Sequence, residues 1–534
     1  MEEERHEHSK SIPPEPGQPP ARETPAKEHP QVEAGHEAAH QKLIPSPFQL
    51  TTIRDLPPQS NAGAVSLHDL LGDPLISECW EFNYLHNIEF LMSHFDEDVR
   101  ALVKIHVVHG NWKREDPSRL ALEEEASRHK NITLHTAYMP EPFGTHHSKM
   151  LILFRHDDTA QVIIHTANMI AKDWTNMTNA VWQSPSLPLS NTTDHGQPDA
   201  AIGTGEKFKA DIMSYLRAYN KQRNVCRALV DNLSKYDFSA VRGALIASVP
   251  GRHPVNDHPS VTRWGWTAMK HALRCVPVQQ GRSEVVVQIS SIATLGGTDT
   301  WIQKTLFDSL SSSGKSSTKP ELKIIFPTPD EISRSLDGYA SGGSIHTKIQ
   351  SAQQQKQLVY LRPVFCHWAN DAAAGLPTDG PSSKLGQRDG GRQRAAPHIK
   401  TYIRYNSSNT LDWALFTSAN ISKQAWGEAA NGVKEVRIAS WEIGVLVWPE
   451  LLAGGEPGAQ MVGVFRKDEP IADDLVKADV QSEGTGGGTT TLVGLRIPYS
   501  LPLKKYGPTE KPWVATADYQ EPDWKGQRWV SWAV

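Results

Sequence analysis

The 534-residue sequence lacks any apolar run that approaches the roughly 20 residues a membrane-spanning helix needs. Its first ten residues, MEEERHEHSK, also lack the apolar core of a secretory signal peptide. No stretch has the basic amphipathic character of a helix that lies on a membrane surface. We therefore expect an intracellular protein that does not bind a membrane.

Cysteine is scarce, and its spacing excludes two kinds of site. The four cysteines are scattered with no CxxC pair, at Cys79, Cys226, Cys275 and Cys366. Disulfide frameworks and structural zinc sites both depend on closely spaced cysteines in characteristic patterns. We expect neither, and interpret the four residues as buried, reduced thiols.

Two common signals of nucleotide and nucleic-acid binding are also missing. The stretch SSSGKSS around Lys315 resembles a phosphate-binding loop, but Ser309 stands where that motif requires its first glycine. The formal net charge is −5, from 55 basic and 60 acidic residues, so the whole chain does not attract polyanions. Any nucleic acid would have to bind in a local basic cleft.

The sequence does contain enough apolar and aromatic residues for more than one packed core. Hydrophobic residues make up 38% of the chain and 16 residues are tryptophan, while single cores rarely exceed about 250–300 residues. Residues 1–45 differ from the rest, because they are rich in Glu, His, Pro and Gln and poor in aliphatic residues. Such a composition does not favour folding, and we predict a disordered N-terminal tail.

Beyond this tail, short β-branched runs alternate with segments of helical length. The expected strands are Ile105–Val108, Val162–His165, Val285–Ser290, Lys323–Phe326 and Val445–Val447. The expected helices lie near Glu89–Phe95, Lys207–Arg217 and Thr267–Leu273. This alternation predicts an α/β fold in layers.

One short pattern occurs in two extended copies. His-x-Lys itself occurs five times and carries no information alone, at His8, His40, His147, His346 and His398. Only the copies at His147 and His398 are followed by a strand, a polar turn, a second strand and then HTANMIAKDW or TSANISKQAW. Asn168 follows His147 by 21 residues, and Asn420 follows His398 by 22. We interpret the other three copies as chance.

Each copy supplies one imidazole, one ammonium group and one carboxamide. Imidazole can attack phosphorus or transfer a proton near neutral pH. Lys149 and Lys400 can hold negative charge on phosphoryl oxygens. Asn168 and Asn420 could simply cap helices, but a helix N-terminus also favours phosphate, and the duplicated upstream residues favour that interpretation. The two copies together predict one site for phosphoryl transfer.

Paired His-x-Lys motifs followed by Asn resemble the phospholipase D superfamily, in which two repeats form one active site. That superfamily usually has Asp five residues after each Lys, where this sequence has Phe154 and Tyr405. This difference, with the motifs GTHHSKM, APHIKTY, TSANISKQAWG and SWEIGVL, resembles the tyrosyl-DNA phosphodiesterase family in particular. The resemblance covers roughly Phe48 to Val530.

The resemblance implies a fold and an activity. The fold would be two similar phospholipase D-like α/β domains, each a mixed sheet sandwiched by helices, related by a pseudo-two-fold axis. We place them at residues 46–240 and 241–534, with the boundary near Phe238 to Val241. The activity would be hydrolysis of the 3′-phosphotyrosyl bond between DNA and trapped topoisomerase I, and of other 3′ adducts, leaving a 3′-phosphate.

The same resemblance implies the localisation, oligomeric state, cofactor requirement and partners of the enzyme. It would be a monomeric DNA-repair enzyme of the nucleus that needs no cofactor and no metal ion. Its partners would be single-stranded or duplex DNA with a 3′ tyrosyl or peptide adduct, and the peptide derived from topoisomerase I. Two alternatives stay open, a phospholipase D-like lipid hydrolase or nuclease, and a protein that binds DNA ends without turnover.

The resemblance also implies a role for each site residue. His147 would attack phosphorus to form a covalent phosphohistidine, and His398 would protonate the leaving tyrosine and later activate water. We therefore expect neutral His147, charged His398 and a bell-shaped pH profile. The groups expected to contact the phosphate are Lys149, Lys400, Asn168 and Asn420.

The remaining candidates orient the imidazoles or bind DNA. Glu442 matches the carboxylate that orients one imidazole, although it could be an ordinary charge at a strand edge. Asn179 stands where the family commonly has Gln, and would orient the other. The residues expected to contact DNA are Tyr84, Phe143, Ser290, Ser291 and Ser422. Tyr84 could instead pack in the core, and we interpret His146 as structural.

Overall fold

The computed structural model describes residues 42–255, 258, 260–314, 318–370, 388–471, 473–474 and 491–531. The predicted N-terminal tail lies outside these residues, apart from its last few, of which Lys42–Ile44 form strand β1. Lys315 of the SSSGKSS stretch also lies outside them. Within the described part of the chain, none of the helices has the length and apolar character needed to cross a bilayer.

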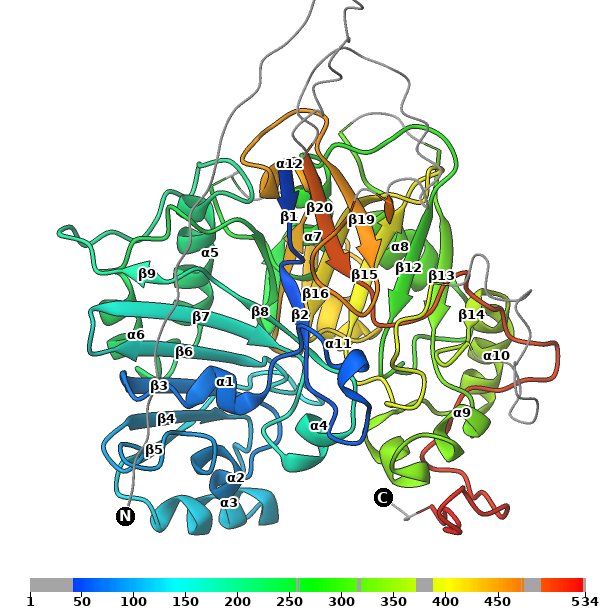
Figure 1. Cartoon of the computed structure of the whole chain (residues 1–534), viewed down its shortest axis with the longest axis horizontal. Coiled ribbons are helices and arrows are strands. Elements are labelled where there is room, and N and C mark those ends of the chain that lie inside the picture. Colours follow the sequence, from blue (N-terminus) through cyan, green and yellow to red (C-terminus); the bar gives the residue numbers. More distant parts are fainter. Residues whose placement is uncertain are drawn as a thin grey trace, which may run out of the picture. The chain divides into compact units, whose positions relative to one another are not determined.

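The first sheet comes from the N-terminal part of the chain. Its eight strands are β2 (Phe48–Leu50), β3 (Ile76–Phe82), β4 (Lys104–His109), β5 (Ile132–Thr136), β6 (Met150–Arg155), β7 (Thr159–His165), β8 (Ala180–Gln183) and β9 (Leu187–Pro188). The order is β2-β8-β7-β6-β3-β4-β5, and β9 pairs with β7 (Figure 1). Strands β3, β4 and β5 run parallel, and the other neighbours run antiparallel.

The second sheet comes mostly from the C-terminal part of the chain. Its ten strands are β1, β10 (Ala244–Ser248), β12 (Glu284–Gln288), β13 (Glu321–Ile325), β14 (Phe365–Cys366), β15 (Thr401–Tyr405), β16 (Leu411–Thr417), β18 (Glu442–Val447), β19 (Gln460–Val464) and β20 (Thr491–Arg496). Strands β11 (Gly251–Pro254) and β17 (Glu435–Ile438) form a separate antiparallel ribbon.

The two sheets repeat one topology. The path β10-β18-β16-β15-β12-β13-β14 matches the path of the first sheet, and every neighbouring pair has the same relative direction. Strands β19, β20 and β1 extend the second sheet beyond this shared part. The prediction of two similar mixed sheets is confirmed. The predicted boundary at Phe238 to Val241 precedes β10, and the division into domains there stays a prediction.

Twelve α-helices are assigned in the described residues. They are α1 (Leu67–Leu71), α2 (Ile88–Met92), α3 (Pro117–Ser127), α4 (Ala171–Thr175), α5 (Gly205–Ala218), α6 (Arg227–Leu233), α7 (Gly265–Leu273), α8 (Phe307–Leu310), α9 (Pro329–Ser333), α10 (Ala352–Leu361), α11 (Lys423–Trp426) and α12 (Pro449–Leu452). Other short helical segments are η1 (Pro58–Ser60), η2 (Ile302–Leu306), η3 (Gly338–Ser344) and η4 (Arg362–Val364). All the predicted strands and helices are present, with bounds shifted by a few residues.

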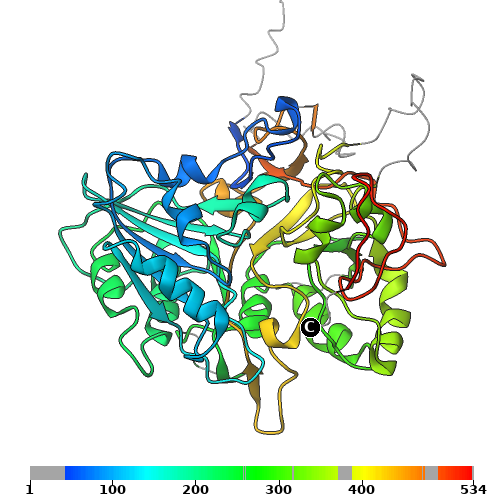
Figure 2. The same ribbon diagram turned by 90° about the horizontal axis from the view of Figure 1, so that it is seen from below.

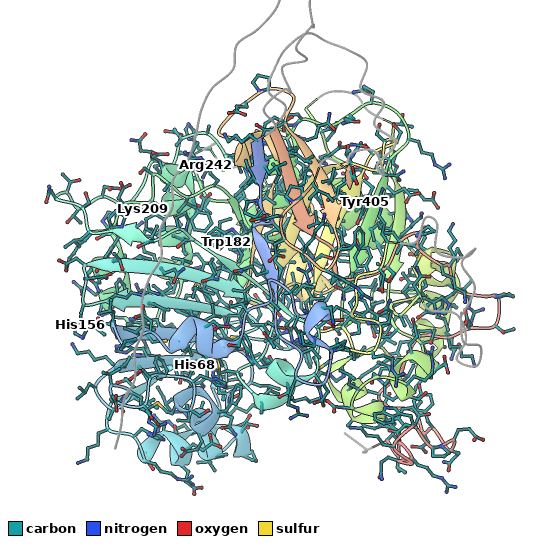
Figure 3. All side chains as sticks on the ribbon, in the orientation of Figure 1. His68, His156, Trp182, Lys209, Arg242 and Tyr405 are labelled. Atoms are coloured by element: carbon teal, nitrogen blue, oxygen red, sulfur yellow. The ribbon has the colours of Figure 1, made fainter. Side chains whose placement is uncertain are left out.

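The sheets share one central core and each has an outer core of its own. The central core contains Trp182 of β8 and Tyr405 of β15, together with α5 and α6 (Figure 3). Figure 2 shows the strands of the two halves side by side. In β6, Met150 and Ile152 face the central core, while Leu151 and Leu153 face the outer core of the first sheet. Burial on both faces explains why this strand is a continuous apolar run.

The cysteines correct one expectation. All four are free, and Cys79, Cys226 and Cys366 are buried as expected. Cys275 is exposed because it lies in the turn that follows α7, so the prediction that it is buried is wrong. The absence of disulfides agrees with the scattered spacing.

Candidate active site

The two repeated motifs lie at equivalent ends of equivalent hairpins. His147 and Lys149 immediately precede β6, and Asn168 follows β7. In the second half, Lys400 immediately precedes β15 and Asn420 follows β16. A backbone hydrogen bond closes each hairpin at its motif lysine, from His165 to the oxygen of Lys149 at 3.0 Å and from Thr417 to that of Lys400 at 3.2 Å. The shared topology thus gives both motifs the same local backbone.

Each motif is held by a segment from the opposite half. The backbone N–H of His147 donates to the oxygen of Trp441 at 3.1 Å. The backbone N–H of His398 donates to the oxygen of Thr178 at 2.9 Å, and Thr178 donates in return to Ala396. Trp441 and Thr178 come directly before Glu442 and Asn179 in the sequence. The backbone therefore brings each orienting residue to the histidine of the other half.

His147 is oriented by Glu442. Its Nδ1 lies 2.9 Å from Glu442 Oε2, and the Ser418 hydroxyl donates to the same oxygen at 2.5 Å. Burial acts to raise the pKa of Glu442, but the His147 and Ser418 contacts outweigh it and lower that pKa. Burial lowers the pKa of His147 to about 4, Glu442 opposes this, and Lys149 adds to it. His147 is therefore neutral near neutral pH, with Nε2 free to act as a nucleophile.

His398 has two acceptors instead of one. Its Nδ1 lies 3.1 Å from Asn179 Oδ1 and 3.3 Å from Asp173 Oδ2. Burial, followed by Lys400 and Lys149, lowers the pKa of His398 well below its usual range. The protein alone therefore does not favour the charged His398 that we expected from the sequence. A bound phosphodiester would raise this pKa, because an anion favours the charged imidazole.

Two buried ammonium groups complete the site. Lys149 and Lys400 have no exposed surface, and in the described chain neither forms an ion pair with a carboxylate. Burial lowers the pKa of Lys149 to about 8, and burial together with Lys149 lowers the pKa of Lys400. Each Nζ donates to the backbone oxygen of the histidine two residues before it. Glu442 and Asp173 act on both ammonium groups from a longer distance. Two buried ammonium groups without a direct ion pair can bind an anion.

A family model described as tyrosyl-DNA phosphodiesterase matches residues 47–507. The chain belongs to the tyrosyl-DNA phosphodiesterase family. It is therefore an enzyme, a phosphodiesterase of the hydrolase class within the phospholipase D superfamily.

Several relatives of this family are similar along most of their length. The chain is 27% identical over 566 residues to a probable tyrosyl-DNA phosphodiesterase of Schizosaccharomyces pombe, covering 94% of this chain and 98% of the relative. It is 29% identical to tyrosyl-DNA phosphodiesterase 1 of Arabidopsis thaliana, covering 91% and 77%. The crystal structure of the yeast tyrosyl-DNA phosphodiesterase shares the fold, with a TM-score of 0.60 and 19% identity over 88% of this chain and 99% of that one.

Asp173 is a site residue of this family member that the sequence prediction missed. Its Oδ2 accepts from the backbone N–H of Asn168 at 2.7 Å and from Asn168 Nδ2 at 2.9 Å, besides lying near His398. The side chain is fully buried, and Oδ1 has no hydrogen-bond partner in the described chain. Asp173 is the one carboxylate in HTANMIAKDW, and the second copy has Ala425 at that position. This difference between the repeats is the sequence signal that could have identified Asp173.

The two asparagines present their amides differently. Asn420 Oδ1 accepts from the backbone N–H groups of Ser290 and Ser291, at 3.1 and 2.9 Å. Only its N–H donors remain for a phosphate oxygen. The side-chain amide of Asn168 instead donates one of its two N–H groups to Asp173, and its second N–H group remains for another acceptor. Ser290 and Ser291 therefore position Asn420, and their contact with DNA stays a prediction.

The other candidates divide into exposed and structural residues. Tyr84 is 42% exposed, with its ring 5.7 Å from that of His147, so packing in the core is excluded for it. Phe143 is 90% exposed and has a φ of 62°. Ser422 caps α11 by accepting from Ala425 at 2.9 Å. His146 is buried and contacts Asn83 and Tyr219, as expected of a structural residue.

No group of three or more His, Cys, Asp or Glu side chains in the described chain could hold a metal ion. The ionisable groups of the site are instead paired histidines, lysines and single carboxylates.

Proposed function

We propose that the enzyme hydrolyses the 3′-phosphotyrosyl bond between DNA and trapped topoisomerase I, and other 3′ blocking adducts, leaving a 3′-phosphate. The observation that carries the proposal is the pairing of two histidines, each oriented by the opposite half, around two buried lysines that form no direct ion pair within the described residues. Such a site has a nucleophile, a proton donor and an anion-binding centre. The names of the relatives supply the substrate class.

In the first step, Nε2 of His147 attacks phosphorus and the bond from phosphorus to the tyrosine oxygen breaks. Glu442 accepts the Nδ1 proton of His147 in a hydrogen bond and stabilises the charge that the ring acquires. His398, protonated once the phosphodiester is bound, gives its proton to the leaving tyrosine oxygen. The phosphoryl oxygens lie against Lys149, Lys400 and the asparagine amides throughout.

In the second step, water breaks the phosphohistidine. Neutral His398 removes a proton from the water, whose oxygen bonds to phosphorus while the bond to Nε2 of His147 breaks. The products are a 3′-phosphate end and free His147. One imidazole therefore serves first as acid and then as base, which requires Asn179 and Asp173 to hold it in one place.

The proposed substrate is single-stranded or duplex DNA with a 3′ tyrosyl or peptide adduct. Exposed aromatic rings such as Phe143 and Tyr84 suit stacking on bases without reading sequence. The second partner is the peptide left from topoisomerase I. We place the enzyme in the nucleus as a monomer acting in DNA repair.

The test uses a 5′-labelled single-stranded oligonucleotide with a 3′-phosphotyrosine, incubated in excess EDTA. The intact enzyme should convert it to a 3′-phosphate end. His147→Ala should reduce conversion to background and form no covalent adduct, because the nucleophile is missing. His398→Ala should slow the reaction by about 10²- to 10⁴-fold, and a denaturing gel should show labelled adduct accumulating.

The controls separate the alternatives. A plain 3′-hydroxyl oligonucleotide and a phosphatidylcholine vesicle test nuclease and lipid hydrolase activity on the same preparations. Cleavage of lipid but not of the phosphotyrosine would replace the proposal with a lipid hydrolase. Binding of the blocked end with no turnover by the intact enzyme would replace it with a DNA-end-binding protein.

A further inference from the structure

His165 is a buried histidine of the first half that has no role in the proposed mechanism. It is the last residue of β7, its side chain has no exposed surface, and the centre of its ring lies 5.6 Å from that of Trp174. Neither Nδ1 nor Nε2 has a hydrogen-bond partner within the part of the chain that the structure describes. Burying an imidazole without a partner costs free energy, and such groups are rare in folded proteins. The unused nitrogens therefore indicate a role beyond packing.

The pairing of β6 and β7 places His165 opposite Lys149 of the active site. Met150 pairs with Ile164, so the next pair toward the site consists of Lys149 and His165. The backbone N–H of His165 donates to the oxygen of Lys149 at 3.0 Å. Opposite residues of an antiparallel pair project from the same face of the sheet, with Cβ atoms about 4.5–5.5 Å apart. The imidazole and the lysine side chain are therefore neighbours.

The second repeat has a different residue at this position, and its side chain is fully bonded. Thr417 lies opposite Lys400 in the same way, with a backbone hydrogen bond of 3.2 Å between them. The Thr417 hydroxyl donates to the oxygen of Ile443 at 3.2 Å and accepts from the N–H of Ala419 at 3.1 Å. Of these two equivalent side chains, His165 alone leaves its polar atoms unused in the described chain.

Lys149 has hydrogen-bond donors to spare. An ammonium group carries three N–H donors, and in the described chain Lys149 Nζ donates to one acceptor, the backbone oxygen of His147, at 3.2 Å. A phosphoryl oxygen would accept from a second donor. Burial, and after it Lys149, lowers the pKa of His165 to about 3, so its ring is neutral near neutral pH. A neutral imidazole has one lone pair that can accept from the third donor.

The charged groups near Lys149 already have other partners. Burial lowers the pKa of Lys149 to about 8, against the opposing effect of three carboxylates, Glu442, Asp173 and Glu81. These carboxylates accept hydrogen bonds from His147, Asn168 and His86, at 2.9, 2.7 and 2.8 Å respectively. The other ionisable side chains whose pKa Lys149 affects are Lys400, His146, His147, His165 and His398. A further acceptor that bonds to the ammonium form would raise the pKa of Lys149.

Resting on the proposed function, we propose that His165 is a positioning residue for Lys149, whose Nζ donates to a ring nitrogen of His165 while the phosphoryl group is bound. This bond fixes the ammonium group against the phosphoryl oxygen and favours its charged form. Trp174 lies beside the imidazole and is itself fixed by a hydrogen bond from Nε1 to the oxygen of Asn168 at 3.0 Å. The first half thus holds its lysine through a side chain that the second repeat does not have.

The experiment measures how much a terminal phosphate contributes to binding. The full-length enzyme is titrated into a 5′-labelled oligonucleotide with a 3′-phosphate, the proposed product, and into the same oligonucleotide with a 3′-hydroxyl. Fluorescence anisotropy gives both Kd values. The ratio of the 3′-hydroxyl Kd to the 3′-phosphate Kd is taken within each enzyme, so a general loss of DNA affinity cancels. For the intact enzyme this ratio should be well above one, because the phosphate reaches Lys149.

Three substitutions separate hydrogen bonding from packing. His165→Gln keeps an acceptor beside Lys149. His165→Leu removes it, and His165→Thr copies the residue of the second repeat, whose hydroxyl bonds to the backbone. Loss of one hydrogen bond to a charged group should reduce the Kd ratio by about 10- to 100-fold in the Leu and Thr variants. His165→Gln should keep most of the ratio, and cleavage of the 3′-phosphotyrosine substrate should fall in the same order.

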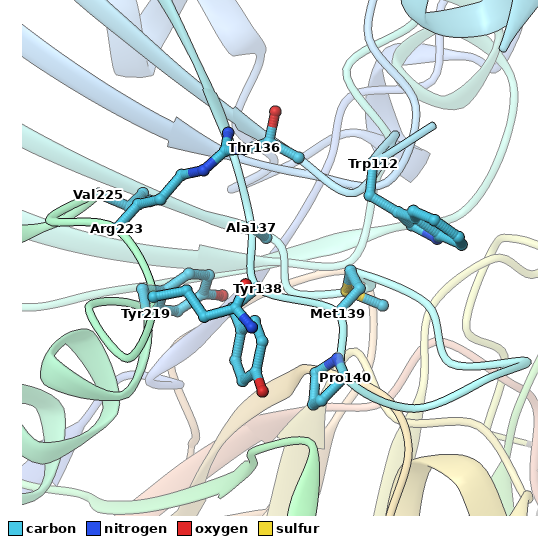
Figure 4. A pocket seen from close by; sticks show the side chains of 10 residues that line it. Trp112, Thr136, Ala137, Tyr138, Met139, Pro140, Tyr219, Arg223 and Val225 are labelled. Atoms are coloured by element: carbon cyan, nitrogen blue, oxygen red, sulfur yellow. The ribbon is translucent and has the colours of Figure 1, made fainter. Parts of the chain in front are cut away.

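The matched control is His135→Leu, the same change at a half-buried histidine of the same sheet. His135 lies on the edge strand β5, where Nε2 lies 3.0 Å from Nδ1 of His106. The next residue, Thr136, lines a cavity of about 370 Å³ together with Trp112 and Arg223 (Figure 4). This control should keep the Kd ratio of the intact enzyme.

The results separate the role of His165 from the proposed function. Equal Kd ratios in the intact enzyme and in His165→Leu would overturn that role. An equal loss in His165→Gln and His165→Leu would also overturn it, since packing alone would then account for the histidine. If His165→Leu does not fold, His165→Thr makes the same comparison with His165→Gln. Failure of the intact enzyme to cleave the 3′-phosphotyrosine substrate would instead reject the proposed function, whatever the Kd ratios.

Discussion

The two half-sites have the same backbone but different chemistry. In both, a histidine precedes the first strand of a hairpin and is held by a backbone bond from the opposite half. His147 then meets a carboxylate, Glu442, whereas the equivalent partner of His398 is a carboxamide, Asn179. A duplicated scaffold therefore supplies the geometry, and a few substitutions give the two histidines different hydrogen-bond partners.

A second difference accompanies the first. The first repeat has Asp173 where the second has Ala425, so a carboxylate reaches His398 from a position with no counterpart near His147. Each histidine thus has one carboxylate nearby, delivered by different elements. The carboxylate of Glu442 makes the closer contact, at 2.9 Å against 3.3 Å for Asp173. Removing each carboxylate in turn tests whether their roles differ.

The largest effect is expected for Glu442→Gln. The amide can present its N–H to Nδ1 and stabilise the wrong ring tautomer, leaving Nε2 protonated and unable to attack. Formation of the covalent adduct should slow by about 10²- to 10⁴-fold. Single-turnover kinetics with a labelled substrate measure it, with Tm as the control for folding. An adduct that forms at the normal rate would contradict the assignment of Glu442 to the nucleophile.

A smaller effect is expected for Asp173→Asn. The carboxylate favours the charged form of His398, so its loss lowers the pKa of that imidazole in the enzyme–substrate complex. Since the proposed first step needs protonated His398, the alkaline limb of the kcat profile should move to lower pH by about one unit, which is a tenfold loss of kcat above that limb.

The control for this variant is Asn168→Ala. It removes the Nδ2 donor of Asn168 to Asp173 but keeps the backbone N–H donor and the carboxylate beside His398. We therefore expect kcat to fall with little movement of the alkaline limb. If Asp173→Asn lowers kcat equally at every pH, Asp173 only supports Asn168. Measuring Tm for both variants shows whether a folding defect accounts for a fall in kcat.

The smallest expected effect is on stability. It should differ between the two halves, because the pKa values of their histidines differ. Burial is the main cause of pKa values lowered to about 3 or 4 at six histidines of the first half, His106, His109, His135, His146, His147 and His165. In the second half, burial acts to lower the pKa of His367, but the Glu331 and Glu510 carboxylates outweigh it and raise that pKa. The pKa values of His346 and His398 are lowered.

A lowered histidine pKa makes stability depend on pH in a definite direction. The unfolded chain takes up protons near about pH 6.5, while the folded one does not until about pH 4. Stability contributed by the neutral rings is complete above about pH 6.5 and falls as the pH drops toward 4. Tm should therefore decrease by several degrees from about pH 7 to about pH 5.

Variants locate this effect in the first sheet. His135→Gln removes one such group and should flatten the fall in Tm, while His258→Gln, at an exposed position, should leave it unchanged. Partial proteolysis at about pH 5 should cut the first half before the second. A Tm that rises on acidification, or earlier cleavage of the second half, would contradict the comparison.

Much of the fold could be predicted from the sequence, because its strands and hairpins are local patterns. The apolar run Met150–Phe154 followed by a turn and a second run marks a hairpin by itself. The similar spacing from histidine to asparagine, 21 and 22 residues, then shows that the hairpin is duplicated. The exposure of Cys275 was predicted wrongly, because exposure depends on neighbours that sequence distance does not reveal.

The sequence by itself determined the chemical groups of this enzyme, two imidazoles, two ammonium groups and two carboxamides in duplicated hairpins. Only the tertiary structure decided their partners. His147 contacts Glu442 across 295 residues, and His398 contacts Asn179 across 219. Asp173 looks in the sequence like an acid in the first turn of a helix, a common position near the positive end of the helix dipole. Its place beside His398 arises because the two halves meet, and contacts across that interface depend on packing rather than on local pattern.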